Sequence, residues 1–441
     1  MEHSNKNRFI TIGLMLFALF FGAGNLIFPA AMGQVAGENL GWALLGFCIT
    51  GVGLPLLGVM AIGYSGCHDL HQVANRVHPM FGIFYTIVCY MAIGPCFAVP
   101  RTGTVSFEIA VRPFLAAEFA DIALPIFLAV FFAIAFWLSA SPSKIVDRVG
   151  KFLTPLLVLA LLILIVKSII TPLGAPQAAS ANYATPVIAA VQGVLDGYNT
   201  LDAIASLVFA TLVVTAVKEA GFENSGHVAR EVYKSGLLAG AFLAVIYIFI
   251  ARIGADSVGV IGMQDTGAPV LTKSAQVLMG DTGAMVLAAI VLLACLTTAI
   301  GLITCCSIYF RALTGRFSYV TWCALFTVVS YLIGLFGLKT IIVSTIPVLM
   351  FIYPLCVALI ALVFLHKFFG GRQCVYAWTV GLTFIMAAIN GLETAKVPLA
   401  GIETFLQTYV PLHTIGLGWI PFAVVGFVIG FIQKSMTPAK A

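Results

Sequence analysis

Apolar residues form long, almost uninterrupted runs along the chain, and polar residues gather in short segments between them. A helix that crosses a membrane needs about 20 mostly apolar residues. Runs of this kind occur about twelve times, which predicts an all-α polytopic membrane protein with about 12 transmembrane helices. The predicted spans are 9–32, 40–63, 79–100, 122–140, 152–170, 187–216, 235–252, 284–310, 319–336, 341–364, 374–391 and 413–432.

The first and sixth spans stand apart because flexible and polar residues interrupt their centres. The first contains FFGAGNLIFP (Phe20–Pro29), and the sixth contains VQGVLDGYNTLDAIASLVF (191–209). The sixth places Asp196 and Asp202 at mid-depth, where a charged side chain costs about 2.5–3.5 kcal/mol. Paired interrupted helices at corresponding positions are the best sequence indication of an inverted-repeat transporter with a midplane site.

The positions of these two spans divide the chain into two five-helix halves. Because five is odd, the second half begins on the opposite side of the membrane, so the repeat is inverted. We predict a single transmembrane domain (1–441) with repeat one at about 9–170, repeat two at about 187–364 and two extra C-terminal helices at about 374–432. The segment 255–281 is predicted to be an outer loop with an amphipathic piece (Val270–Met279) that lies across the outer mouth.

Composition and charge agree with this architecture. The chain is 61% hydrophobic and only 9% charged, whereas soluble domains carry about 25% charged residues. With the N-terminus inside, fifteen of the 22 Lys and Arg residues fall on the inner side and six on the outer side, while Arg101 lies within a span. The positive-inside rule therefore places both termini in the cytoplasm. The net charge of +5 reflects this topology and does not indicate a nucleic-acid partner.

A break within a membrane helix leaves N–H groups unpaired on one side and C=O groups on the other. The N–H groups, aided by the helix dipole, suit a carboxylate, and the carbonyls suit a sodium ion or an ammonium group. Gly22 and Gly24 allow the backbone to turn and to approach a ligand, and Pro29 extends the unpaired stretch. The first span therefore predicts a polar socket for a small zwitterion and a cation; the alternative is a glycine kink that only eases helix packing.

The eighth span adds oxygen atoms on one helical face. Ala294, Thr297 and Thr298 lie at positions i, i+3 and i+4. A carbonyl and two hydroxyl groups on one face can coordinate a hard cation. The alternative is that Thr298 hydrogen-bonds its own helix at Ala294.

The third span carries charged residues that are rare in membrane helices. Glu108 and Arg112 stand at i and i+4, in the order that favours a surface ion pair. Arg101 has no local partner and follows Pro100. We predict that Arg101 lines a water-accessible vestibule.

Three motifs together resemble one family. FFGAGNLIFP, GPCFAVPRTGTVSFE (94–108) and GYNTLDAIASLVF (197–209) resemble the bacterial branched-chain amino acid carriers, the leucine/isoleucine/valine:cation symporter family. The resemblance covers essentially the whole chain. It implies an architecture similar to that of the sodium-coupled leucine transporters, with a five-plus-five inverted repeat and alternating access. It also implies symport of leucine, isoleucine and valine with sodium across the bacterial cytoplasmic (inner) membrane, with no other cofactor.

The resemblance further implies the residues of the site. Those that bind the substrate, at its carboxylate through main-chain amides or at its ammonium group, are Phe20, Gly22, Ala23, Gly24, Asn25, Tyr198, Thr200 and Asp202. Those that bind sodium, through carbonyl or hydroxyl oxygens, are Ala18, Phe21, Ala294, Thr297 and Thr298. We name Phe209 and the residues of the third span near Phe97 as candidates for the pocket of the aliphatic side chain.

One feature departs from the family pattern of the leucine transporters. They carry a basic gate residue where Leu26 and Ile27 are apolar here. Their outer gate therefore does not transfer, and Arg101 and Glu108 are the candidate vestibule or gate residues.

Other classes of function fit less well. The seven histidines lie in loops or at span ends and the ten cysteines form no CxxC pair, so no catalytic or metal centre is predicted and the protein is not expected to be an enzyme. Paired helix breaks favour a closed site over the continuous pore of a channel. The remaining alternative is a proton-coupled amino acid transporter of the same fold, with Asp202 and Glu108 as proton carriers.

Overall fold

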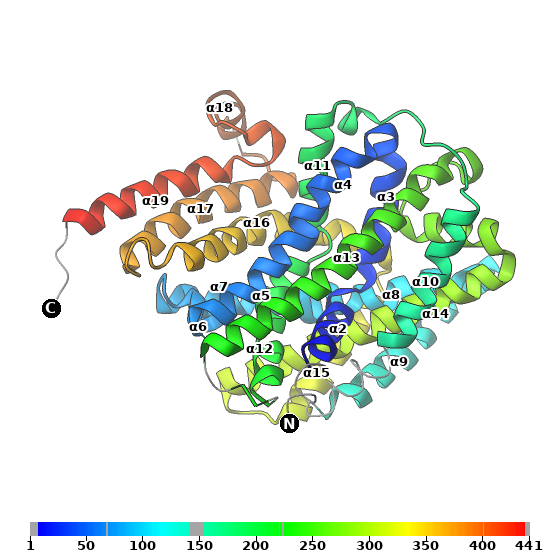
Figure 1. The fold of residues 1–441 in the computed structure, drawn as a ribbon, viewed down its shortest axis with the longest axis horizontal. Helices are drawn as coiled ribbons and strands as arrows, with labels where there is room; N and C mark the ends of the chain where they lie inside the picture. Colours follow the sequence, from blue (N-terminus) through cyan, green and yellow to red (C-terminus); the bar gives the residue numbers. More distant parts are fainter. Residues whose placement is uncertain are drawn as a thin grey trace.

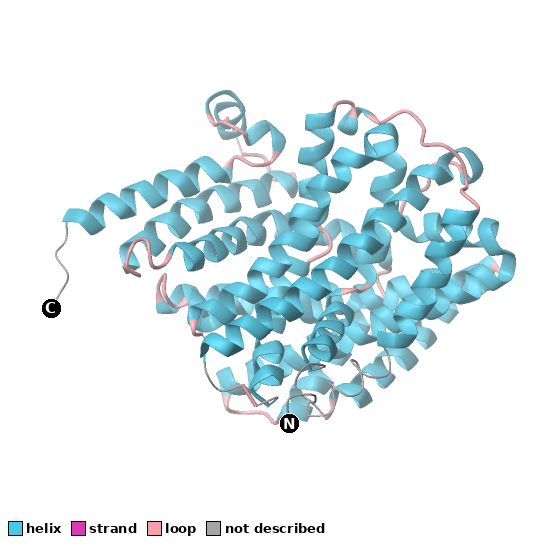
Figure 2. Cartoon of the chain, in the orientation of Figure 1, coloured by secondary structure: helices cyan, strands magenta, loops and turns pink. Residues whose placement is uncertain are grey.

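The computed structural model describes residues 8–67, 69–141, 154–219, 221–222, 225–399 and 401–436, and every regular element in these ranges is a helix (Figures 1 and 2). The α-helices are α2 (Arg8–Phe20), α3 (Ala23–Ala36), α4 (Leu40–Cys48), α5 (Leu54–Ser65), α6 (Leu70–Ala74), α7 (Pro79–Met91), α8 (Ala98–Ala110), α9 (Ala120–Ser139), α10 (Thr154–Ile170), α11 (Pro186–Tyr198), α12 (Asp202–Glu219), α13 (Ser225–Ile261), α14 (Gly267–Thr314), α15 (Tyr319–Gly334), α16 (Leu338–Leu365), α17 (Gln373–Thr394), α18 (Ile402–Tyr409) and α19 (Trp419–Met436).

The membrane architecture predicted from the apolar runs is confirmed. Within the described ranges, eight helical segments are long and apolar enough to cross a membrane, or nine when the bent pair α11 and α12 counts as one span. Three shorter apolar helices, at Phe9–Phe20, Thr154–Ile170 and Tyr319–Gly334, coincide with further predicted spans. Residues 152 and 153, at the start of the fifth predicted span, lie outside the described residues.

The prediction of an outer loop at 255–281 is wrong for most of the segment, which is helical, while its amphipathic piece (Val270–Met279) lies within α14. Helix α13 continues to Ile261 and α14 begins at Gly267, with a kink at Gly280. Leu271 and Leu278 are buried at helical spacing, so this segment covers the protein with the apolar face of a helix.

The packing of the interrupted spans is the same in the two halves of the chain. Both halves of span 1 (α2 and α3) pack along α13, the seventh span, and both halves of span 6 (α11 and α12) pack along α4 and α5, the second span. In an inverted repeat, span 1 corresponds to span 6 and span 2 to span 7. The packing of span 1 on span 7 therefore corresponds to the packing of span 6 on span 2. The third span (α8) packs on the eighth (α14). These two spans correspond to each other in the repeat, so their contact also fits it. This pairing supports the inverted repeat, whose residue boundaries stay a prediction.

Glycines bring two of these helix pairs into backbone contact. A Cβ atom on Gly33 of α3 would lie 2.0 Å from the carbonyl oxygen of Ala251 in α13, and Gly254 approaches α3 in the same way. Gly46 and Gly193 form the matching contact between α4 and α11, where an added Cβ would lie 1.9 and 2.0 Å from a carbonyl oxygen of the other helix. Each pair therefore packs too closely for any larger residue at these positions.

The segment between α10 and α11 (171–185) is fastened to the end of α3. The Ser180 N–H donates to the Val35 carbonyl at 2.9 Å, and the Asn39 side-chain amide donates to the Tyr183 carbonyl at 2.7 Å. The two interrupted spans are thereby connected at one end of the molecule.

The extra C-terminal helices form a layer of their own. Helix α17 packs against α16 and α19, and Figure 1 shows these three helices side by side at the left of the molecule.

Candidate functional site

The break in the first span is short and closely packed. Helix α2 ends at Phe20 and α3 begins at Ala23, with Gly22 in an extended conformation (φ −125°, ψ −158°). A Cβ atom on Gly22 would lie 2.6 Å from the Thr298 hydroxyl of α14. Glycine is therefore required here because the backbone touches the eighth span. Pro29, by contrast, lies inside α3 and is not part of the break.

The break in the sixth span is a bend of 44° between α11 and α12. Leu201 takes a left-handed conformation (φ 69°), which costs a non-glycine residue roughly 1–2 kcal/mol. The Thr200 hydroxyl donates to the Gly197 carbonyl at 2.9 Å and accepts from the Asp202 N–H at 3.4 Å. This side chain therefore satisfies backbone groups that the bend leaves unpaired.

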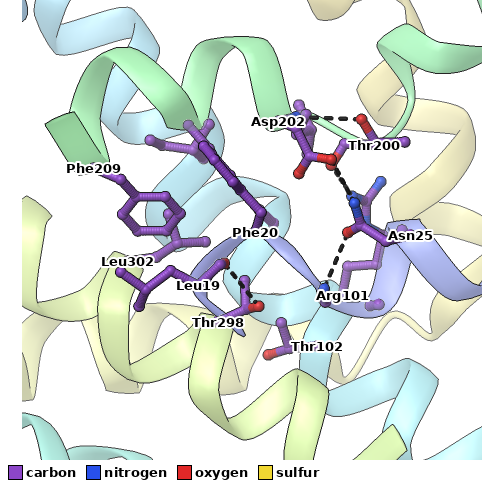
Figure 3. A pocket seen from close by; sticks show the side chains of 17 residues that line it. Leu19, Phe20, Asn25, Arg101, Thr102, Thr200, Asp202, Phe209, Thr298 and Leu302 are labelled. Carbon is purple, nitrogen blue, oxygen red and sulfur yellow. Dashed lines mark hydrogen bonds between the residues drawn. The ribbon is translucent and has the colours of Figure 1, made fainter. Parts of the chain in front are cut away.

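The two breaks meet at a pocket whose lining residues are mostly buried (Figure 3). Its lining residues come from four spans, the first, third, sixth and eighth, and are Leu19, Phe20, Gly22, Ala23, Gly24, Asn25, Ile93, Ala98, Arg101, Thr102, Thr200, Leu201, Asp202, Ala205, Phe209, Thr298 and Leu302. All the predicted substrate residues are among them except Tyr198, which is stacked on Tyr353 with ring centroids 4.2 Å apart. The geometry brings these residues together, and their binding roles stay predictions.

A polar cluster occupies one side of the pocket. The side-chain oxygen Oδ1 of Asn25 accepts the Gly22 N–H at 3.0 Å, and the side-chain nitrogen Nδ2 donates to Asp202 Oδ2 and to the Tyr247 hydroxyl. Tyr247 in turn donates to Asp202 Oδ2 at 3.0 Å. Three spans thus converge on one buried carboxylate. Sequence reasoning missed Tyr247, because a tyrosine within the apolar α13 carries no signal of its partners.

The opposite side of the pocket is apolar. Phe20 and Phe209 meet edge to face with ring centroids 5.8 Å apart, and Figure 3 shows Phe209 beside Leu302, across the pocket from Asp202. Of the third-span residues near Phe97, the other candidates from the sequence, Ile93 and Ala98 line the pocket, whereas Phe97 itself does not. Polar groups at one end and apolar groups at the other fit a small amphiphilic molecule.

Arg101 is not in a vestibule, as the sequence predicted, but lines this pocket and is only 3% exposed. Its Nη1 donates to the Asn199 carbonyl at 2.8 Å, and its Nη2 donates to the Thr200 carbonyl at 3.4 Å. The reason is a further helix break that we did not predict. A π-helix (Ala92–Cys96) with non-helical dihedral angles at Gly94 interrupts the third span and redirects α8 toward the pocket.

Glu108 does not join Arg101. It lies near the end of α8, where it forms the predicted ion pair with Arg112 at 2.8 Å, and that pair is largely exposed. The two candidate gate residues are therefore not brought together. Asp196, the other aspartate of span 6, also lies outside the pocket and accepts hydrogen bonds from Tyr183 and Gln192.

The threonines of α14 bridge to the first span. The Thr297 hydroxyl lies 2.9 Å from both the Ala18 and the Ala294 carbonyl oxygens, and the Thr298 hydroxyl lies 3.0 Å from the Leu19 carbonyl. The bond to Ala294 is thus made by Thr297, whereas the sequence suggested Thr298. Phe21, the fifth predicted sodium ligand, is buried at the same break. These oxygens could hold a small cation, and such binding stays a prediction.

A transition-metal centre finds no support in the geometry. Among the residues described, no group of three or more His, Cys, Asp or Glu side chains is placed to hold a metal ion.

The family of the protein follows from comparison with known sequences. A family model described as "Branched-chain amino acid transport protein" matches residues 5–437. The chain belongs to this family. The branched-chain amino acid permease BraB of Bacillus subtilis is 44% identical over 96% of this transport protein and 94% of its own length. The branched-chain amino acid transport system 2 carrier protein of Pseudomonas aeruginosa is 36% identical over 98% and 97%. The relatives are named as permeases or carriers, so the protein is a multi-pass bacterial membrane transporter and not an enzyme.

Solved structures agree on the fold. Mhp1, a nucleobase-cation-symport-1 family transporter with bromovinylhydantoin bound, has a TM-score of 0.62 at 16% identity and covers 97% of this transport protein and 91% of its own chain. MhsT in complex with L-phenylalanine has a TM-score of 0.56 at 18% identity, with 96% and 98% covered. The fold of the leucine transporters, which the family resemblance implied, is thus confirmed.

Proposed function

We propose that this protein imports leucine, isoleucine and valine by symport with sodium, through alternating access to the pocket between the interrupted spans. The observation that carries the proposal is the meeting of both helix breaks at one buried pocket with a polar and an apolar side. The relatives named for branched-chain amino acids support the substrate class.

The pocket suggests how the amino acid lies. Its carboxylate faces the N-terminal amides of α3 at Ala23 and Gly24, since the Gly22 amide is already bonded to Asn25. Its ammonium group faces the Asp202 carboxylate and the carbonyl end of α2. Its aliphatic side chain extends toward Phe209. Each group of the substrate thereby meets a complementary part of the lining.

The sodium ion is proposed to bind between α2 and α14. The Thr297 and Thr298 oxygens already lie at hydrogen-bonding distance from carbonyl oxygens of α2, so a cation can enter among them with small movements. Because the ion would join the first and eighth spans, its binding favours the conformation in which both are correctly placed, and substrate then favours closure.

Proton coupling is the second candidate. Asp202 is a buried carboxylate held by Asn25 and Tyr247, and such a group can carry a proton across a membrane. Glu108 is a weaker candidate because it is paired with Arg112 away from the pocket.

The test is uptake of labelled leucine into proteoliposomes under a sodium gradient, with isoleucine and valine as competitors. We expect uptake that requires an inward sodium gradient and is inhibited by both competitors. Uptake that ignores sodium and follows a pH gradient would assign the coupling to protons. The same liposomes without the protein are the control.

The location and orientation belong to the proposal as well. The family and its relatives support a bacterial membrane, and the excess of Lys and Arg on one side supports the cytoplasmic membrane with both termini inside.

A further inference from the structure

Arg101 carries a positive charge that the pocket only partly satisfies. A guanidinium group has five N–H donors, and two of them bond the Asn199 and Thr200 carbonyls. The Nε–H is buried and has no partner. Within the described residues, no acidic side chain forms an ion pair with Arg101. The charge of Asp202 acts on the guanidinium only from beyond ion-pair distance. Because burying a charge without a contacting partner is costly, the position suits an anionic ligand.

The position of the guanidinium indicates where that partner binds. A Cβ atom on Gly24 would lie 2.7 Å from Arg101 Nη2, so the guanidinium packs directly on the first turn of α3. The free N–H groups at the start of that helix favour an anion at the same place. The ring of Phe28 lies beneath the guanidinium at 5.2 Å and helps to hold it. A carboxylate here would meet both the helix N-terminus and Arg101.

Asp202 supplies a negative charge to the same pocket. Asp202 also lines the pocket and is 3% exposed. Within the described chain, both hydrogen bonds from other side chains to its carboxylate end at Oδ2, which leaves Oδ1 for a ligand. An arginine and an aspartate at one pocket match the two charges of a zwitterion.

We propose that Arg101 binds the substrate carboxylate and makes the carrier select amino acids over amines of the same shape. The proposal rests on the function proposed above and adds a residue to it. A charge-assisted, two-pronged hydrogen bond from arginine suits a carboxylate better than a backbone amide alone. In the competing interpretation, Arg101 only closes the C-terminal end of α11 at Asn199 and Thr200.

The two interpretations differ in how ligands respond to Arg101→Gln. The ligands are leucine and leucinol, in which a hydroxymethyl group replaces the carboxylate. Dissociation constants come from the ligand dependence of thermal unfolding of the purified full-length protein with sodium present. We expect Arg101→Gln to weaken leucine binding about ten- to a hundredfold and to change leucinol binding by less than about twofold.

Arg101→Lys is the second variant, since it keeps the charge but not the planar fork. We expect an intermediate loss that is again confined to leucine, and the same comparison applies if Arg101→Gln cannot be purified. Arg112→Gln, which removes an exposed arginine next to the same helix, is the matched control and should leave both ligands unaffected.

The outcome decides between the interpretations. Equal weakening of leucine and leucinol, or no weakening of leucine, overturns the carboxylate role of Arg101. Failure of the wild-type protein to respond to leucine would instead overturn the proposed substrate class, and the assignment of Arg101 with it.

Discussion

Asn25 shows how much of the site depends on single side chains. Its side-chain oxygen accepts the Gly22 N–H at the start of α3, while its side-chain nitrogen donates to Asp202 and Tyr247 on two other spans. The same residue therefore shapes the helix break and fixes the carboxylate of the pocket. Because Asn25 and Asp202 are buried, such bonds are individually strong and their loss is costly.

Thr298→Ala tests the proposed sodium site. The change removes a hydroxyl that contacts the first span at Leu19, and we expect the sodium concentration for half-maximal leucine uptake to rise about tenfold, as for loss of one bond to a charged group. The measurement is uptake against sodium concentration in proteoliposomes. Ser307→Ala is the control, because this α14 hydroxyl bonds Ile303 of its own helix. An unchanged sodium dependence in Thr298→Ala would remove this hydroxyl from the site.

The sequence was informative about residues whose chemistry conflicts with a membrane span. The positions of Gly22, Asn25 and Asp202 at the helix breaks could be predicted, because flexible and polar residues destabilise a continuous apolar membrane helix. Tyr247 and the position of Arg101 could not, because which helices face one another is decided by packing between distant segments. No local pattern in the chain records those contacts.

At the scale of the helix, the breaks and the close glycine contacts have different roles. The breaks supply free peptide groups, and the glycine contacts hold the unbroken parts of the same spans against their neighbours. The break in the third span was missed although its Gly94–Pro95 pair is a known helix breaker. The charged residues of this span begin only at Arg101, beyond the break, whereas in the first and sixth spans the polar residues lie within the break itself.

Gly33→Ala tests the contact between α3 and α13. The added Cβ would lie 2.0 Å from a backbone carbonyl oxygen, so the helices must separate. We expect a loss of stability of about 1–3 kcal/mol, as for other overpacked sites, measured as a lower thermal unfolding midpoint of the purified protein. Gly41→Ala is the matched control, because nothing lies within 4 Å of its added Cβ. Equal midpoints for the two variants would show that α3 and α13 can adjust without cost.

At the scale of the molecule, a polar junction ties the first repeat to the C-terminal layer. Arg76 donates to the Ser65 carbonyl at 2.9 Å and to the Tyr376 hydroxyl at 3.3 Å, and its Nη1 lies 3.4 Å from His366 Nδ1. His366 Nδ1 also contacts the Tyr376 hydroxyl at 2.9 Å. Because arginine only donates, His366 faces it with an unprotonated nitrogen.

This junction predicts a pH dependence. Burial and the charge of Arg76 lower the pKa of His366, so the unfolded chain takes up this proton more readily than the folded one. The stability from this histidine is therefore present above the ordinary histidine pKa and is lost as the pH falls through the lowered value. We expect the unfolding midpoint to fall less on acidification in His366→Gln than in the wild type. The exposed His227→Gln is the control, and identical pH profiles for wild type and His366→Gln would contradict the prediction.

The segment between α10 and α11 has a mechanical consequence. Asn39 holds it at Tyr183, and α11 begins only three residues later, at Pro186. Three residues span at most about 10 Å, so the far ends of the two interrupted spans are joined by a very short tether. While the Asn39 bond holds, the connected ends of the first and sixth spans cannot move apart. Any opening of the protein on that side must therefore move the two ends together.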